Sequence, residues 1–316
     1  MVRLRIFLAL AISLFLIAGC GKEKEPEQLK VGVLPIEDIM PTVTAEKNGY
    51  FTLENLDVEI VRFQSAVEQI NAVQAGQLDG IITDMIVAAM LKDAGQDVKV
   101  TAITLGAAPE EGRFGIIAAP NSGIATLADL KGKSVGISYN SIIEYITDGL
   151  LEDGGMAPSE VHKVSVPKIP VRMEMLFNNK IDAIVVPDPL LTFGAFKGAK
   201  IVAQDTKDTK RNLSQAVVVF SQKTLDEKKS AVQGFYRGYA KAVDDLNNHP
   251  DNYTQLLTEN VNVPEPIAKD YPIQRYPKPQ IPNEEDVNNV LEWMKNKSLL
   301  KTDLKYQDLV DQSFGA

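Results

Sequence analysis

The sequence predicts an α/β fold built from two similar lobes. Between residues 29 and 204, short apolar runs typical of buried strands alternate with segments of helical periodicity, which is the pattern of a mostly parallel sheet flanked by helices. The order of elements repeats after about a hundred residues: residues 31–33 match 135–137 at an offset of 104, and residues 78–83 match 181–186 at an offset of 103. The chain has 316 residues, 45% of them hydrophobic, enough for two domains with proper cores.

Residues 1–19 predict a lipoprotein signal peptide. Arg3 and Arg5 precede an apolar run over residues 6–17, which is shorter than the ~20 residues that span a bilayer. The run ends in Ile-Ala-Gly-Cys, which resembles a lipobox, in which the cysteine is lipidated and becomes the first residue. Cys20 is the only cysteine, so it cannot form a disulfide within the chain. We expect a lipid anchor at Cys20; an ordinary cysteine at the end of the apolar run is the alternative.

Residues 20–28 predict a flexible tether, because they are mostly charged and contain no large apolar side chain. The formal net charge of the chain is −9, which argues against a nucleic acid as partner. No motif for a cofactor, a metal or a catalytic site is present, so we expect none of these. We expect a monomer on the outer side of the cytoplasmic membrane or in the periplasm.

The first lobe is expected to start at residue 29. A glycine directly follows each predicted helix, as at many helix ends. The expected strands are 29–34, 57–63, 80–83 and 98–105, and the expected helices are 41–48, 66–75 and 84–94.

Residues 114–138 are expected to carry the chain into the second lobe. An apolar strand at 114–119 is followed by a turn, one helical turn between Thr126 and Gly132, and a strand at 134–137. The further elements expected in this lobe are helices at 141–152 and 171–178 and strands at 181–186 and 200–204.

A last strand at 215–220 is expected to return the chain to the first lobe. The predicted domains are therefore 29–114 with 219–316, and 115–218, with hinges near 115–118 and 217–219. No linker precedes the amphipathic helices that follow, so we expect them to pack on the first lobe; a third domain is the alternative. These helices are expected at 225–248, 251–260, 284–297 and 302–314.

The stretch from Pro120 to Gly136 reads P-x-S-x-I-x-x-L-A-D-L-K-G-K-x-V-G. It resembles the crossover of type II periplasmic binding proteins, in the superfamily that binds aliphatic sulfonates, nitrate and thiamine pyrimidine precursors. The resemblance implies a solute-binding component of an ABC importer, with a permease as partner and a ligand cleft that closes by a hinge. The alternatives are a sensor for a membrane receptor, an adhesin, or the pyrimidine-forming enzymes of a eukaryotic branch. Those enzymes rely on a cysteine-rich motif and an active-site histidine; Cys20 lies in the signal, and His162 and His249 are expected at the surface.

Candidate ligand-binding residues lie where loops follow the strands, because open α/β sheets bind ligands beyond the carboxyl ends of their strands. Ser65, Asp84 and Ser141 are also suited to capping helices. Glu144 is placed either to face the cleft or to offset a helix dipole, and Arg113 either reaches a ligand anion or is solvated. The candidates are Pro35, Asp38, Ser65, Thr83 and Asp84 in the first lobe and Ser138, Asn140, Ser141, Glu144 and Asp188 in the second.

Asp188 directly follows a predicted buried strand and lies between two prolines that stiffen the loop. It resembles the proline-containing loop of the family that contributes to the binding site, although Val186 and Pro187 stand where relatives often carry an aromatic or acidic residue. No helix N–H is expected to satisfy its carboxylate. Because the candidate loops hold several carboxylates and few cations, we expect a cationic or hydrogen-bond-donating ligand, a nitrogen heterocycle or amine in preference to a sulfonate.

Overall fold

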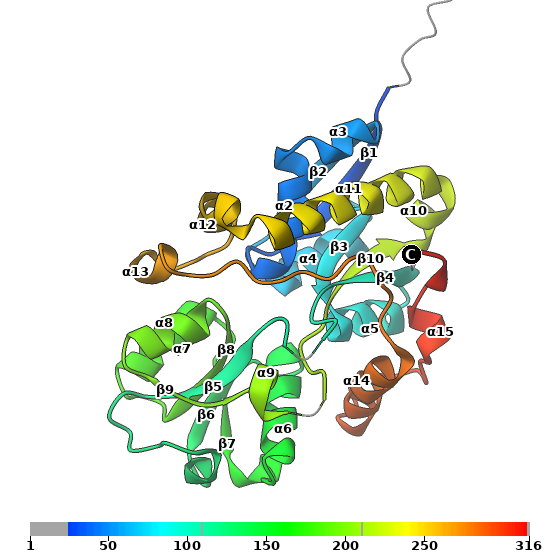
Figure 1. Ribbon diagram of the computed structural model, residues 1–316. Helices are drawn as coiled ribbons and strands as arrows, with labels where there is room; N and C mark the ends of the chain where they lie inside the picture. Colours follow the sequence, from blue (N-terminus) through cyan, green and yellow to red (C-terminus); the bar gives the residue numbers. More distant parts are fainter. Residues whose placement is uncertain (1–24, 109, 210, 315–316) are drawn as a thin grey trace, which may run out of the picture.

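The computed structural model describes residues 25–108, 110–209 and 211–314. The signal peptide, Cys20 and the first part of the tether therefore lie outside the described residues. The described chain forms two lobes, each built around a five-stranded sheet with helices packed against it (Figure 1). This confirms the expected two-lobed α/β fold. Among the described residues, no helix has both the length and the apolar character needed to cross a membrane.

The first sheet has the strand order β2-β1-β3-β10-β4. Its strands are β1 (Glu27–Val33), β2 (Leu56–Arg62), β3 (Gly80–Asp84), β4 (Val98–Leu105) and β10 (Ala216–Ser221). β1 pairs in parallel with β2 and β3, whereas β10 is antiparallel to β3 and β4. The helices between these strands are α2 (Met40–Lys47), α3 (Tyr50–Leu53), α4 (Ala66–Gln74) and α5 (Met85–Asp93). As the sequence predicts, Gly76 and Gly95 lie just beyond α4 and α5, with left-handed φ angles of 67° and 84°.

The second sheet has the order β7-β6-β8-β5-β9. Its strands are β5 (Phe114–Ala118), β6 (Ser134–Ile137), β7 (His162–Ser165), β8 (Ala183–Pro187) and β9 (Lys200–Gln204). The helices of this lobe are α6 (Ile142–Asp153), α7 (Ile169–Phe177), α8 (Leu190–Phe196) and α9 (Asp205–Asp208). β5 is antiparallel to β8 and β9, and the remaining pairs are parallel. In each sheet, four strands thus run parallel to one another and one runs antiparallel. The antiparallel strand is β10 in the first sheet and β5 in the second, and each is the first strand after the chain passes from one lobe to the other.

The crossings correct the expected lobe boundaries. Phe114 already lies in the second sheet, and residues 216–218 already lie in the first. The chain therefore crosses between the sheets at 106–113 and 209–215, and not within strands at 115–118 and 217–219. An apolar run predicts a strand, but the run looks the same whether the strand belongs to the first sheet or to the second. The sequence pattern therefore does not show at which residue the chain passes from one lobe to the other.

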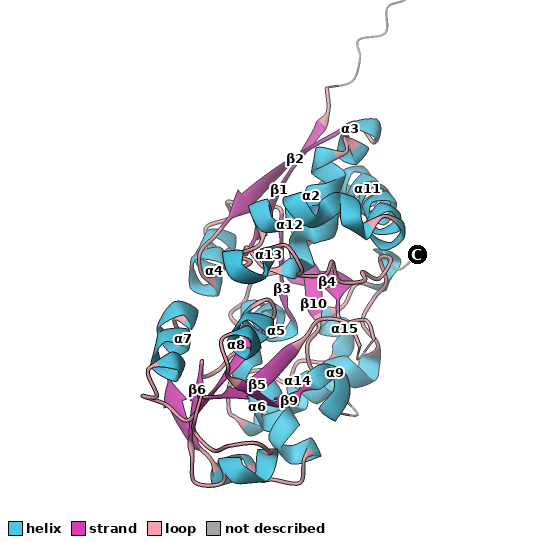
Figure 2. Cartoon of the chain, turned by 60° about the vertical axis from the view of Figure 1, so that its left-hand side comes forward, coloured by secondary structure: helices cyan, strands magenta, loops and turns pink. Residues whose placement is uncertain are grey.

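The carboxy-terminal helices pack on the first lobe, as expected: α11 lies against α2 and α3, α14 against α5, and α15 against β4 (Figure 2). The expected helix at 302–314 is wrong, because only α15 and a short 3-10 turn form there. The expected helix at 225–248 is divided at Lys228. The helices are α10 (Gln222–Glu227), α11 (Lys229–Asn248), α12 (Thr254–Asn260), α13 (Glu265–Ala268), α14 (Glu284–Asn296) and α15 (Tyr306–Leu309).

The internal repeat extends to individual hydrogen bonds. In the first lobe, the Lys30 N–H donates to the Asp79 carboxylate at 2.8 Å. In the second lobe, the Ser134 N–H donates to the Asp182 carboxylate at the same distance. A second hydrogen bond is repeated in the same way. The Gln69 side chain donates to the Ile82 carbonyl in the first lobe, and the Arg172 side chain donates to the Val185 carbonyl in the second. Because both lobes use the same contacts at offsets of 103 or 104 residues, the two lobes are pseudo-equivalent in structure as well as in sequence.

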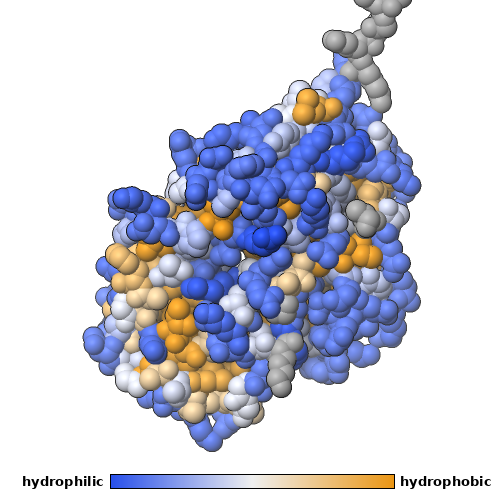
Figure 3. All heavy atoms as spheres, viewed as in Figure 1, coloured by the Kyte–Doolittle hydropathy of each residue, from blue (hydrophilic) through white to orange (hydrophobic). Residues whose placement is uncertain are grey.

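One layer of the hydrophobic core continues from lobe to lobe. It joins buried side chains of α5 and β4 to those of α6 and β6, with Val287, Leu291 and Met294 of α14 between them. The other faces of the two sheets have separate cores. On the face seen in Figure 3, hydrophilic side chains cover most of the first lobe, and apolar side chains gather on the second.

Candidate functional site

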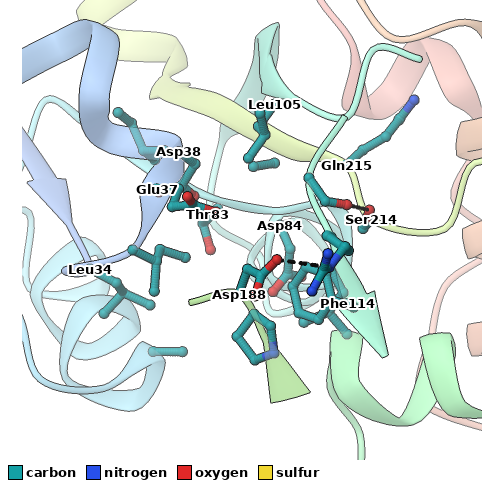
Figure 4. Close-up of a pocket in the computed structure, with 18 residues that line it drawn as sticks. Leu34, Glu37, Asp38, Thr83, Asp84, Leu105, Phe114, Asp188, Ser214 and Gln215 are labelled. Atoms are coloured by element: carbon teal, nitrogen blue, oxygen red, sulfur yellow. Dashed lines mark hydrogen bonds and ion pairs between the residues drawn. The ribbon is translucent and has the colours of Figure 1, made fainter. Parts of the chain in front are cut away.

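A cavity of about 80 Å³ lies between the lobes, in front of the crossings (Figure 4). This is several times the roughly 10–15 Å³ that one water molecule needs on the same scale. Its described walls comprise Leu34, Ile36, Glu37, Asp38, Ala66, Ile82, Thr83, Asp84, Leu105 and Ala216 of the first lobe, Gly112, Arg113, Ser214 and Gln215 of the crossings, and Phe114, Ile142, Pro187 and Asp188 of the second lobe.

The site forms where parallel strands end side by side. β1 and β3 are neighbours, so the turn after β1, which carries Glu37 and Asp38, lies next to Thr83 and Asp84 at the end of β3. The end of β8 supplies Asp188 from the opposite lobe. Figure 4 shows these carboxyl groups around one space.

Four of the ten candidate residues line the cavity: Asp38, Thr83, Asp84 and Asp188. The other candidates are absent from its described walls, and they are Pro35, Ser65, Ser138, Asn140, Ser141 and Glu144. Arg113 borders the cavity, and its side chain is 27% exposed. Glu37, beside the candidate Asp38, and Gln215 of the second crossing are wall residues that sequence reasoning did not select.

The three suspected caps behave differently. The Ser65 hydroxyl accepts the Glu68 N–H at 3.3 Å, and the Asp84 carboxylate accepts the Val87 N–H at 2.9 Å. Ser141 precedes α6, but its hydroxyl donates to the Ser138 carbonyl at 2.7 Å. Asp84 therefore uses one oxygen to cap α5 while its carboxyl group borders the cavity.

Burial governs the ionisation of the first-lobe carboxyls. It raises the pKa of Asp84 to about 6 and that of Glu37 to about 8, although the Tyr271 hydroxyl donates to Glu37 at 2.7 Å and opposes the rise. Burial also raises the pKa of Asp38 well above its usual range, and the neighbouring Asp84 and Glu37 add to the effect. One Asp38 oxygen, Oδ1, is buried and has no hydrogen-bond partner among the described residues.

Asp188 has local partners, contrary to expectation. Its Oδ2 lies 2.8 Å from Arg113 Nε, and its Oδ1 accepts the Thr192 N–H of α8 at 2.8 Å. The Arg113 guanidinium also donates to the Thr192 hydroxyl at 3.0 Å. α8 begins directly after the Asp188–Pro189 turn, which brings its first N–H groups to the carboxylate. Asp188 therefore supports the fold as well as the cavity wall, and its substitution affects both.

Glu144 faces a different part of the chain. Its Oε2 accepts the Asn140 N–H at 2.8 Å, and its Oε1 pairs with Lys297 at 2.8 Å and with Lys163 at 3.3 Å. Lys297 follows α14, so Glu144 contacts a carboxy-terminal helix and not the cavity.

The cavity combines carboxyl groups with apolar walls. Among its described wall residues, Glu37, Asp38, Asp84 and Asp188 are acidic, and Arg113, already paired with Asp188, is basic. Such a wall suits a ligand that donates hydrogen bonds or carries positive charge. No cluster of metal-ligating side chains is found among the described residues.

A family model described as "NMT1/THI5 like" matches residues 36–253, more than half of the chain. The chain belongs to this family. A putative aliphatic sulfonates-binding protein of Bacillus subtilis is 24% identical over 266 residues, which cover 80% of this chain and 77% of that protein.

Solved structures share the fold of this family member. The periplasmic aliphatic sulphonate binding protein SsuA from Escherichia coli aligns with a TM-score of 0.76 at 17% identity, covering 92% of this chain and 99% of the other. The desulfurization enzyme DSZB aligns with a TM-score of 0.68 at 16% identity, covering 91% and 97%. The same fold therefore carries binding and catalysis, so function has to be argued from the cavity.

The described wall residues of the cavity include no cysteine and no histidine. Cys20, the only cysteine, lies outside the described residues. His162 and His249 are exposed, as expected, and neither is among the described wall residues.

Proposed function

We propose that this chain is the lipid-anchored, extracytoplasmic solute-binding component of an ABC importer, and that its ligand is a small amine or nitrogen heterocycle. The family, the fold shared with a periplasmic binding protein and the cavity between two lobes support the binding role. The unpartnered buried Asp38 oxygen is the observation that carries the ligand class.

Ligand binding would act by closing the lobes about the two crossings. Gly106 and Gly112 adopt left-handed φ angles of 80° and 66° in the first crossing. Side chains of the second crossing hold them: Asn212 donates to the Gly106 carbonyl at 2.6 Å, and the Ser214 hydroxyl donates to the Gly112 carbonyl at 2.8 Å. A ligand that contacts both lobes favours the closed arrangement by its greater affinity for it.

The charge pattern favours a cation or a hydrogen-bond donor over an anion. A buried carboxyl oxygen without a partner is costly, and a ligand N–H placed between Asp38 and Asp84 would remove that cost. A sulfonate would lie beside the Asp84 carboxylate, whose pKa of about 6 leaves it ionised at neutral pH, while competing with Asp188 for Arg113. The first-lobe wall is thus suited to a ligand with nitrogen-bound hydrogens and an apolar body.

The ligand class is tested by native mass spectrometry of the protein as purified, followed by calorimetry. We expect a co-purified or titrated amine or aminopyrimidine to bind, and alkanesulfonates of matched size to leave no heat signal. Sulfonate binding in the cavity would reject the ligand class and retain the binding role. Turnover of the bound molecule would reject the binding role itself.

Asp84→Asn tests the site with that ligand. The amide keeps an oxygen to cap α5 but loses the charge, and removal of one member of a buried charged pair weakens binding by about 2–5 kcal/mol, or roughly 30-fold to several-thousand-fold. Asp97→Asn is the control, since Asp97 forms an exposed ion pair with Lys92. Equal affinity of Asp84→Asn and the control would remove Asp84 from the site.

Cys20→Ser tests the lipid anchor. Without the thiol no lipid can be attached, so we expect the variant to lack the mass of the lipid and to shift from the membrane fraction. Cell fractionation and intact-mass measurement read both effects. A variant that remains in the membrane fraction at the wild-type mass would contradict lipidation at Cys20.

A further inference from the structure

A buried cluster of charges joins α6 of the second lobe to α14 of the first. Lys297 Nζ, at the end of α14, lies 2.8 Å from Glu144 Oε1 and 3.0 Å from Asp148 Oδ2. The Trp293 indole N–H donates to Asp148 Oδ2 at 3.0 Å. Lys163 of β7 contacts both carboxylates. Two carboxylates thus meet two ammonium groups, one supplied by each lobe.

The carboxylates of the cluster are sheltered from solvent, and Lys297 is partly exposed. The side chains of Glu144 and Asp148 are 3% exposed, that of Lys163 is 10% exposed and that of Lys297 is 33% exposed. The Trp293 ring packs edge-on against Tyr145 of α6, with ring centroids 5.3 Å apart, and Lys297 Nζ lies 5.6 Å from its centre. Charges held in this way are screened far less than surface pairs, so loss of one partner is costly.

The lobes also touch at a second place, on the cavity side. There α13 of the first lobe packs on α8 of the second, and Phe193 of α8 contacts apolar side chains of both lobes. Figure 1 shows α8 and α13 at the left of the molecule and α14 at the right, and Figure 2 brings the left side forward and leaves α14 behind. The charged cluster is therefore separate from the contact beside the cavity.

We propose that the Lys297 cluster is an interlobe tether that favours the arrangement of the lobes seen in this structure without touching the ligand. α6 and α14 belong to different lobes, so a rotation that separates them removes Lys297 from Glu144 and Asp148. Two buried carboxylates are then left with one lysine. The arrangement seen here is thus favoured before a ligand arrives, and its population sets the apparent affinity of any ligand that binds to it.

Lys297→Met removes the tether, and Lys295→Met is the matched control. Lys295 lies in the last turn of α14, two residues before Lys297, and forms an exposed ion pair with Asp303 at 3.1 Å, within the first lobe. The readout is the distance between spin labels on cysteines introduced at the exposed positions Lys47 and Lys180, one in each lobe, in a Cys20→Ser background without added ligand. We expect Lys297→Met to reduce, by about tenfold or more, the ratio of the parent's main interlobe distance to other distances, and Lys295→Met to match the parent.

A second variant covers the case in which Lys297→Met does not fold. Trp293→Phe keeps an aromatic ring against Tyr145 and removes only the N–H that reaches Asp148, so we expect a smaller shift in the same direction. Identical distance distributions for the parent and a folded Lys297→Met protein would overturn the proposal. So would an equal shift in Lys295→Met. Neither outcome depends on the identity of the ligand, so the tether and the proposed function fail separately.

Discussion

The ligand-free protein is expected to lose about 4–8 kcal/mol of unfolding free energy as the pH rises from about 5 to about 8. The cause is the group of cavity carboxyls whose pKa values are raised by burial, to about 6 for Asp84 and about 8 for Glu37. The buried Asp205, whose pKa burial raises to about 7, acts in the same direction beside the crossings.

The sign follows from proton binding. Between its ordinary pKa and its raised pKa, each of these groups holds more proton in the folded chain than in the unfolded chain. Stability is therefore fully present below the ordinary value and is lost as the pH rises through the raised value. For the half-buried Asp84 we expect about 2 kcal/mol, and for the more buried Glu37 a larger share. Glu144 and Asp182, whose pKa values charged and hydrogen-bonding partners lower, act in the opposite sense below about pH 4.

Urea unfolding at a series of pH values measures this profile. Glu37→Gln keeps an acceptor for the Tyr271 hydroxyl and should flatten the profile between about pH 5 and 8, whereas Asp84→Asn should flatten it mainly below about pH 6. Asp251→Asn, at an exposed position, is the control. If the unfolding free energy of the parent protein stayed constant or rose between about pH 5 and 8, burial would not raise the pKa values of these carboxyls, and the prediction would be wrong.

The alternation of strands and helices could be predicted from the sequence, because each element carries its own period and end signals. The turn at Thr126 is an example: Asp129, three residues later, accepts the Thr126 N–H at 2.9 Å. The edge strand β7 and the single-turn helix α13 were missed. Both are short and largely polar or exposed, so neither has a periodic apolar pattern to detect.

The sequence predicts where the candidate site lies, but it does not predict which side chains contact one another there. Asp84 and Asp188 follow apolar strands, and that position alone puts them at the cavity. Their ionic partners depend on the fold: Glu144 meets Lys297, which lies 153 residues away in the chain. Local sequence carries no signal for a pairing at that distance, so a carboxylate that could either face the cleft or offset a helix dipole is found paired with one lysine from each lobe.

Gly106→Ala is expected to lower the unfolding free energy by about 2–5 kcal/mol. Gly106 has a φ angle of 80°, and a Cβ there would lie 2.4 Å from the carbonyl oxygen of Ser214 in the second crossing. Both crossings would have to shift, because the obstacle is backbone and cannot turn aside as a flexible side chain can. The bond from Asn212 to the Gly106 carbonyl would be strained by the same movement.

Gly95→Ala is the control that separates the cost of a clash with the second crossing from the cost of a left-handed backbone at alanine. Gly95 has a similar φ angle of 84°, but a Cβ there would meet nothing within 4 Å. We expect Gly95→Ala to cost about 1 kcal/mol, the penalty for a left-handed alanine, so the difference between the two variants measures the contact between the crossings. Urea unfolding followed by circular dichroism gives both values. Equal losses in the two variants would mean that the crossings are free to separate at Gly106, and would contradict the close backbone approach on which the hinge depends.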